Sequence, residues 1–198
     1  MNLANKLTLL RVILAPLFFT VYFLPMRLMG GAVWTVALLW LIFIAAEFTD
    51  MFDGMAARRL NQGSDFGKLF DPFADTIMQI TCFLCFSIDK IIPAALFVVV
   101  FYREFGILFI RNLMLRKGVV MGARRGGKMK TITYITAASI ALLYSSLRRL
   151  AIAESLQPVV KITVIAVFGI SVLFSVLSFF DYVSVYRASY RASSGKVE

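Results

Sequence analysis

Six stretches of mostly apolar residues run through the chain, and each has about the length that a membrane-spanning helix needs. They lie near residues 9–26, 32–49, 72–88, 91–110, 131–147 and 158–180. A helix that crosses a bilayer requires roughly 20 such residues. Because these stretches fill most of the 198-residue sequence, we expect a single all-α domain over 1–198. It would be a polytopic membrane protein with six transmembrane helices and without a soluble module.

The basic residues between these stretches predict how the chain is oriented in the membrane. The formal net charge is +10, and most of the lysines and arginines fall on one side if the N-terminus is cytoplasmic. We therefore expect a multi-pass membrane protein with both termini on the cytoplasmic side. The basic rim favours anionic lipids as partners, and this charge placement requires no nucleic acid.

The N-terminal segment MNLANKLTLLRV carries polar residues together with Lys6 and Arg11. We expect it to begin as an interfacial helix that then enters the membrane. Although a basic start before an apolar stretch is typical of signal peptides, a small-residue cleavage site is missing and further spans follow. We therefore interpret the first span as retained.

Aspartates gather where the second apolar stretch ends and the third begins. Helical spacing puts Asp50 and Asp53 on one stripe, and it puts Asp71 and Asp75 one turn apart. The connection between them is short, so the two helices should pack antiparallel with their acidic faces together. Residues on the same stripes are Gly54, Ala57, Arg58 and Gly67.

Four carboxylates near hydrocarbon repel one another and are costly to bury, so positive charge is expected among them. Oxygen ligands without histidine or cysteine suit hard cations such as Mg²⁺ or Mn²⁺. Space for two ions suggests phosphoryl-transfer chemistry. The small residues Gly54, Ala57 and Gly67 would let a bulky substrate approach the backbone.

The pattern D-x2-D-G-x2-A-R-x8-G-x3-D-x3-D is matched at every specified position from Asp50 to Asp75. In this pattern the chain resembles the CDP-alcohol phosphatidyltransferase family. The resemblance implies a six-helix membrane bundle, usually a homodimer. It also implies transfer of a phosphatidyl group from CDP-diacylglycerol to an alcohol, with release of CMP.

The resemblance also implies roles for individual residues. Two Mg²⁺ or Mn²⁺ ions would be held by the four aspartates, and Asp75 would be the general base that deprotonates the acceptor hydroxyl. Arg58 would help to position the diphosphate. The residues along the cytidine nucleotide would be Gly54, Ala57 and Gly67.

Three further patches resemble the phosphatidylglycerophosphate synthase branch of this family. They are Asn5-x-Leu7-Thr8-x-x-Arg11, Arg103-Glu104-Phe105, and Lys117-Gly118-Val119-Val120 leading to Gly127-Lys128-Met129-Lys130-Thr131. The branch resemblance implies sn-glycerol 3-phosphate as the acceptor. It also implies a bacterial inner membrane as the location, with the active site on the cytoplasmic side. The cations that could bind its phosphate are Arg103, Arg111, Lys128 and Lys130.

Two observations leave open both the role of Arg103 and the identity of the acceptor. Arg103 could instead pair with Glu104 or with another carboxylate. Thr76 stands where the branch resemblance leads us to expect a lysine directly after the last aspartate. Inositol phosphate, serine, choline and phosphatidylglycerol therefore remain alternative acceptors.

A function of another class is a cation or proton carrier, because carboxylates within a membrane are typical of ion pathways. The aspartates, however, lie at the ends of apolar stretches and not near their centres. An acceptor-dependent release of CMP would separate the enzyme from the carrier.

Three other features are interpreted as having no catalytic role. Cys82 and Cys85 lie in an apolar helix and are expected to be core residues. The glycine-rich segment that ends at Lys128 lacks the serine or threonine of a nucleotide-binding loop, since Met129 follows. Asp65 is expected to be a solvated turn residue.

Overall fold

The computed structural model describes residues 3–60, 65–116 and 125–194, and within them the side chains of 6–49, 70–115 and 129–188. The described residues form helices and no strand, which confirms the all-α prediction. The helices are α1 (Leu3–Phe23), α2 (Ala32–Leu60), α3 (Asp65–Ile88), α4 (Ala94–Arg116), α5 (Arg125–Leu150) and α6 (Gln157–Ser194). Two short 3₁₀ helices, η1 (Met26–Met29) and η2 (Glu154–Leu156), lie between them.

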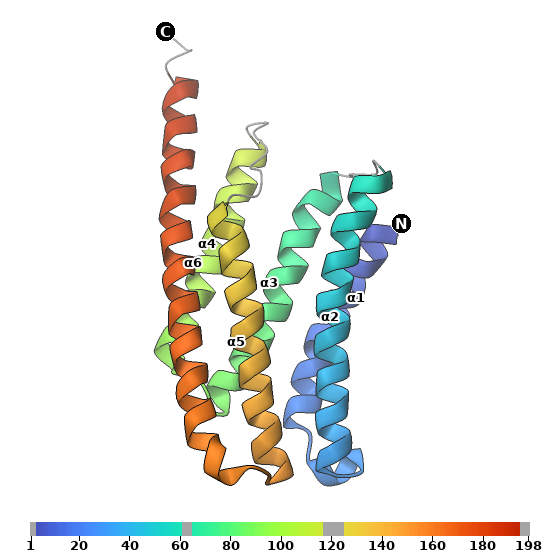
Figure 1. The fold of residues 1–198 in the computed structure, drawn as a ribbon. Coiled ribbons are helices and arrows are strands. Elements are labelled where there is room, and N and C mark those ends of the chain that lie inside the picture. The colour runs from blue at the N-terminus through green and yellow to red at the C-terminus, as the bar shows by residue number, and fades with distance from the viewer. Residues whose placement is uncertain (1–2, 61–64, 117–124, 195–198) are drawn as a thin grey trace.

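The helices form an elongated bundle in which consecutive helices run in opposite directions (Figure 1). Helix α1 packs against both α2 and α3, whereas α6 packs against α4 and α5. Helix α2 ends and α3 begins at one end of the bundle, and the start of α1 and the end of α6 lie toward that same end (Figure 1). The turns after α1, α3 and α5 lie at the opposite end.

The turns at this opposite end contain residues that stop or start helices. Pro25 precedes η1, and Gly30 adopts a φ of 79° to close it, a left-handed conformation that glycine tolerates without strain. Pro93 comes immediately before α4, where a missing backbone N–H costs little. The helices are therefore joined by short connections that reverse the chain.

Aromatic and small residues form the core between the helices. The Phe83 ring meets Tyr134 at 5.3 Å and Phe168 at 4.9 Å between centroids, which joins α3, α5 and α6. Cys82 and Cys85 are buried and free, in agreement with the prediction that they are core residues. Large apolar side chains cover the outside; Trp34 and Ile162, for example, are each 68% exposed. An apolar exterior of this kind is stable in lipid and unusual in water.

Within the described part of the chain, three segments are long and apolar enough to cross a membrane: Lys6–Phe23, Ala32–Thr49 and Glu154–Ala188. The structure therefore confirms part of the expectation of six transmembrane helices. Helix α4 carries charged residues along its length, including Arg103 and Glu104, and α5 contains many serines and threonines. Their polar side chains lower the hydropathy of helices that are otherwise long enough to span.

Two expected boundaries differ from the structure. Helix α1 is continuous from Leu3 to Phe23, so the expected interfacial helix does not form a separate element; the sequence between the polar start and the apolar stretch contains no glycine or proline that would break it. Asp65 was expected in a turn, but it is the first residue of α3. Acidic residues are favourable at helix N-termini, where the helix dipole is positive.

A cluster of polar side chains connects α1, α3 and α5 at the end of the bundle where the turns after these three helices lie. The Tyr22 hydroxyl donates to Asp89 Oδ2 at 2.9 Å and lies 3.0 Å from Ser145 Oγ. Arg149 donates to the backbone oxygen of Tyr22 at 2.8 Å, and its guanidinium lies 4.5 Å from the Tyr22 ring centroid. These contacts join the ends of α1, α3 and α5.

Candidate active site

The acidic motif lies on α2 and α3, at the end of the bundle where these two helices meet (Figure 1). Asp50 and Asp53 are in the last turns of α2, and Asp71 and Asp75 are in the first turns of α3. The two helices run in opposite directions, as the sequence predicted. Residues of the motif whose side chains lie outside the described ones are Asp50, Asp53, Gly54, Ala57, Arg58 and Gly67. Their assigned roles stay predictions.

Helix α1 brings two further side chains to this motif. The Thr8 hydroxyl donates to Asp71 Oδ1 at 2.7 Å, and the Arg11 guanidinium forms an ion pair with Asp75. Thr8 and Arg11 are 0% and 2% exposed, so both are held inside the protein. Neither residue was a predicted ligand, base or substrate contact, although the pattern Asn5-x-Leu7-Thr8-x-x-Arg11 contains both.

Asp71 and Asp75 fit a hard divalent cation by their chemistry. They offer carboxylate oxygens from adjacent turns of one helix, and the side chain of Asp75 is 37% exposed. Asp75 contacts Arg11 through its buried Oδ1. Within the described side chains, these two aspartates are not joined by a third metal-ligating residue; Asp50 and Asp53 fall outside that set.

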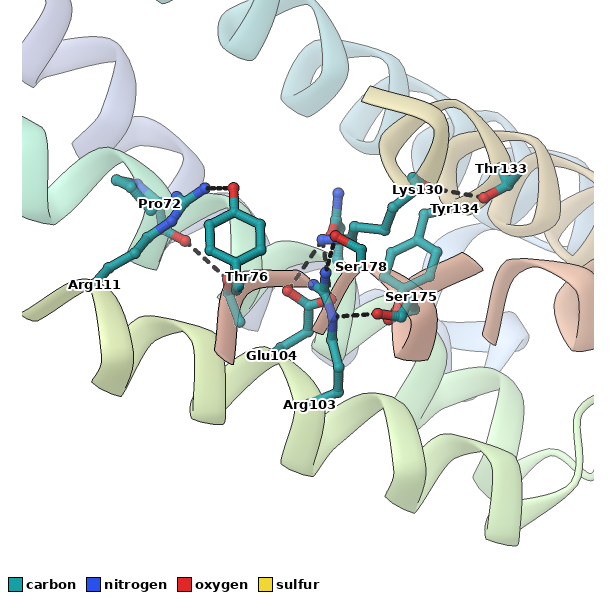
Figure 2. A network of polar contacts seen from close by, with 12 residues as sticks. Pro72, Thr76, Arg103, Glu104, Arg111, Lys130, Thr133, Tyr134, Ser175 and Ser178 are labelled. Carbon is teal, nitrogen blue, oxygen red and sulfur yellow. Dashed lines mark hydrogen bonds and ion pairs between the residues drawn. The ribbon is translucent and has the colours of Figure 1, made fainter. Parts of the chain in front are cut away.

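A second polar cluster lies between α4 and α5 and is centred on Glu104 (Figure 2). Its carboxylate accepts from Arg103 Nη1 at 2.7 Å and from Lys130 Nζ at 2.9 and 3.0 Å. The side chains of Arg103 and Glu104 are 6% and 4% exposed. Charges buried this deeply require partners, and here one carboxylate serves two cations.

Helix α6 supplies the remaining partners of Arg103. Arg103 Nε donates to the Ser175 backbone oxygen at 2.9 Å, and Arg103 Nη2 donates to Ser178 Oγ at 3.2 Å (Figure 2). The Tyr134 hydroxyl donates to Ser175 Oγ at 2.6 Å. Arg103 thus adopts the alternative pairing with Glu104 that the sequence left open. Its role in binding an acceptor phosphate stays a prediction.

Arg111 lies on α4 two turns beyond Arg103. Its Nη2 donates to the Tyr182 hydroxyl at 3.0 Å, and the guanidinium carbon lies 5.4 Å from the Tyr182 ring centroid. The side chain of Lys128, the third predicted phosphate ligand, lies outside the described residues. Arg103, Arg111 and Lys130 together carry more positive charge than Glu104 balances.

Gln79 connects the cluster around Glu104 to α3, the helix that carries Asp71 and Asp75. Lys130 Nζ donates to Gln79 Oε1 at 3.4 Å, and Gln79 follows Asp75 by four residues, which is about 6 Å along the axis of α3. The hydroxyl of Thr76 bonds back to the Pro72 backbone oxygen at 2.8 Å. Position 76 thus carries a threonine whose hydroxyl is bonded within α3, and the lysine that contacts α3 is Lys130 of α5, at Gln79.

Comparisons with known proteins agree with this arrangement. The sequence profile of the CDP-alcohol phosphatidyltransferases matches residues 1–177. The chain is 36% identical to the CDP-diacylglycerol–glycerol-3-phosphate 3-phosphatidyltransferase of Treponema pallidum, across 94% of this chain and 89% of the relative. It is also 36% identical to the enzyme of the same name from Bacillus subtilis, across 73% of this chain and 78% of that one. Since the profile covers most of the sequence and the acidic motif is complete, the chain belongs to the CDP-alcohol phosphatidyltransferase family.

Proposed function

We propose that this enzyme transfers the phosphatidyl group from CDP-diacylglycerol to sn-glycerol 3-phosphate, giving phosphatidylglycerophosphate and CMP. The observation that carries this acceptor assignment is the 36% identity, over 94% of the chain, to a relative named for that reaction. Membership of a phosphatidyltransferase family also favours an enzyme over the cation or proton carrier that the carboxylates alone left open.

In the proposed reaction, Asp75 accepts the proton of the acceptor hydroxyl, and the acceptor oxygen attacks the lipid-side phosphorus as CMP leaves. A general base in this position contributes about 10² to 10⁴ in rate. Asp50, Asp53, Asp71 and Asp75 would hold Mg²⁺ or Mn²⁺, and two such ions would neutralise charge on the diphosphate. Arg58 would help to orient that diphosphate.

The remaining roles concern substrate binding. Gly54, Ala57 and Gly67 would line the path of the cytidine nucleotide. The phosphate of the acceptor would be held by Arg111, Lys128 and the cationic cluster around Glu104. The surplus of positive charge in that cluster supports an anionic acceptor, because unbalanced buried charge is costly. The contact between Lys130 and Gln79 supports placing this phosphate near Asp75.

We propose six membrane spans, with α3, α4 and α5 crossing the bilayer beside the three more apolar helices. The acidic end of the bundle, together with both termini, would face the cytoplasm of a bacterial inner membrane. This assignment follows from the excess of lysine and arginine at that end. We also propose that the protein forms a homodimer and that its basic rim contacts anionic lipids.

An acceptor panel with the purified full-length enzyme tests the function. CMP release from CDP-diacylglycerol would be measured with Mg²⁺ and either sn-glycerol 3-phosphate, inositol phosphate, serine, choline or phosphatidylglycerol. We expect turnover with glycerol 3-phosphate and at most background with the others. A preference for another alcohol would refute the acceptor assignment. CMP release at the same rate with and without an acceptor would refute the transferase mechanism.

A further inference from the structure

Helix α1 contributes two buried polar side chains to the acidic motif, although the motif itself lies on α2 and α3. We propose that Thr8 and Arg11 are positioning residues that fix the carboxylates of Asp71 and Asp75 for cation binding and for proton transfer. This inference rests on the proposed function insofar as that function assigns both aspartates to the cation site. It adds a third helix to the site.

The spacing of the two residues on α1 matches the spacing of the two aspartates on α3. Thr8 and Arg11 are three residues apart on α1, and Asp71 and Asp75 are four residues apart on α3, so each pair shares one helix face. Thr8 donates to Asp71 Oδ1 at 2.7 Å, while Arg11 pairs with Asp75. Two consecutive turns of one helix therefore contact two consecutive turns of the other.

The hydroxyl of Thr8 makes a contact unlike those of several other threonines in this protein. The hydroxyls of Thr20, Thr35 and Thr81 each donate to the backbone oxygen four residues earlier, at 2.8 to 3.0 Å. Thr8 donates across to a carboxylate that is 63 residues away in the sequence. A hydrogen bond to a charged acceptor is stronger than one between neutral groups and restricts the rotation of the carboxylate.

Arg11 is a charged residue that α1 holds almost fully inside the protein. Its side chain is 3% exposed, and a charge at this depth in an apolar helix requires a partner or a polar cavity. Its ion pair reduces the repulsion between Asp75 and the neighbouring acidic residues. Arg11 thereby keeps the Asp75 carboxylate oriented toward the motif before any cation enters.

The two contacts are expected to affect different measurable quantities, namely cation affinity and kcat. Loss of the Thr8 hydroxyl loosens Asp71, which is proposed to be a cation ligand but not the base. Loss of the Arg11 guanidinium misplaces Asp75, which is proposed to be the base, and a displacement of about 1 Å can lower a rate by about 10². Thr8 is therefore linked mainly to cation affinity and Arg11 mainly to kcat.

The test uses the purified full-length enzyme in detergent, with Mn²⁺ binding followed by electron paramagnetic resonance and turnover measured with CDP-diacylglycerol. We expect Thr8→Val to weaken Mn²⁺ binding by about tenfold, the value of one charge-assisted hydrogen bond. Thr20→Val is the matched control on the same helix and should bind Mn²⁺ like the wild type. Arg11→Met should lower kcat by about 10² with little change in KM, and Arg11→Lys should restore part of it.

Several results would overturn the inference. Wild-type Mn²⁺ affinity in Thr8→Val, equal losses in Thr8→Val and Thr20→Val, or a wild-type kcat in Arg11→Met would each do so. Size-exclusion profiles identify variants that do not fold; if Arg11→Met is among them, the Mn²⁺ affinity of Thr8→Val decides. Since Mn²⁺ binding needs no acceptor, a selective loss in Thr8→Val would support the inference even if glycerol 3-phosphate were not used.

Discussion

Replacing Glu104 by glutamine removes the negative charge that lies between Arg103 and Lys130. Both cations contact this carboxylate at 2.7 to 3.0 Å, and the side chains of Arg103, Glu104 and Lys130 are only 6%, 4% and 12% exposed. Glutamine preserves the shape of the side chain but leaves two positive charges facing each other. We expect the variant to be less stable because those charges remain buried.

The magnitude follows from the cost of breaking a buried ion pair, which is about 3 to 5 kcal/mol. Ser175, Ser178 and Gln79 would still accept from the two cations, so we expect a loss near the lower end, about 3 kcal/mol. For a chain of this length, each kcal/mol lowers the unfolding temperature by about 2 to 4 °C. The expected decrease is roughly 6 to 12 °C.

Thermal unfolding of the purified protein in one detergent measures this effect. Glu154→Gln, at an exposed position in η2, removes the same charge elsewhere and should leave the unfolding temperature unchanged. The double variant Glu104→Gln with Lys130→Met should regain part of the loss, since the surplus cation is gone. An unfolding temperature of Glu104→Gln equal to that of the wild type would refute the view that this carboxylate holds the cluster together.

Three further predictions concern separate parts of the molecule. Asp75→Asn should bind CDP-diacylglycerol with near-normal affinity but lose at least about 10² in turnover, because it removes the proposed base; binding and CMP-release assays on one preparation check this. Tyr22→Phe should cost about 1 to 2 kcal/mol of stability, since Asp89 loses its hydroxyl donor, while turnover stays within about twofold because the site lies at the other end of the bundle. Gly106→Ala should destabilise the packing of α4 on α6 by about 1 kcal/mol or less, measured by thermal unfolding, because the Cβ added 3.0 Å from Phe179 Cε2 crowds a half-buried ring while alanine gains about 1 kcal/mol of helix propensity over glycine.

The helical fold and the position of the acidic motif could be predicted from the sequence. Lengths of apolar sequence determine how many long helices a chain can form, and the spacing of Asp71 and Asp75 fixes that they share a face of one helix. The prediction that the cysteines are core residues was confirmed as well. Each of these conclusions depends on local periodicity alone.

The contacts between helices could not be predicted in the same way. Nothing in the spacing of α1 indicates that Thr8 and Arg11 lie against α3, because that contact depends on how distant helices pack. Similarly, Thr76 was identified as a departure, but only the structure reveals that Lys130 of α5 approaches the following turn of α3 through Gln79. The continuity of α1 was also missed, since a polar start does not by itself break a helix.

Anomalous diffraction from crystals of the enzyme grown with Mn²⁺ tests most directly whether the acidic motif is a cation site. We expect a peak between the end of α2 and the start of α3, with oxygens of Asp50, Asp53, Asp71 and Asp75 at about 2 Å from bound ions. Side chains of Asp50 and Asp53 that point into lipid, or a Mn²⁺ peak remote from these aspartates, would contradict the account.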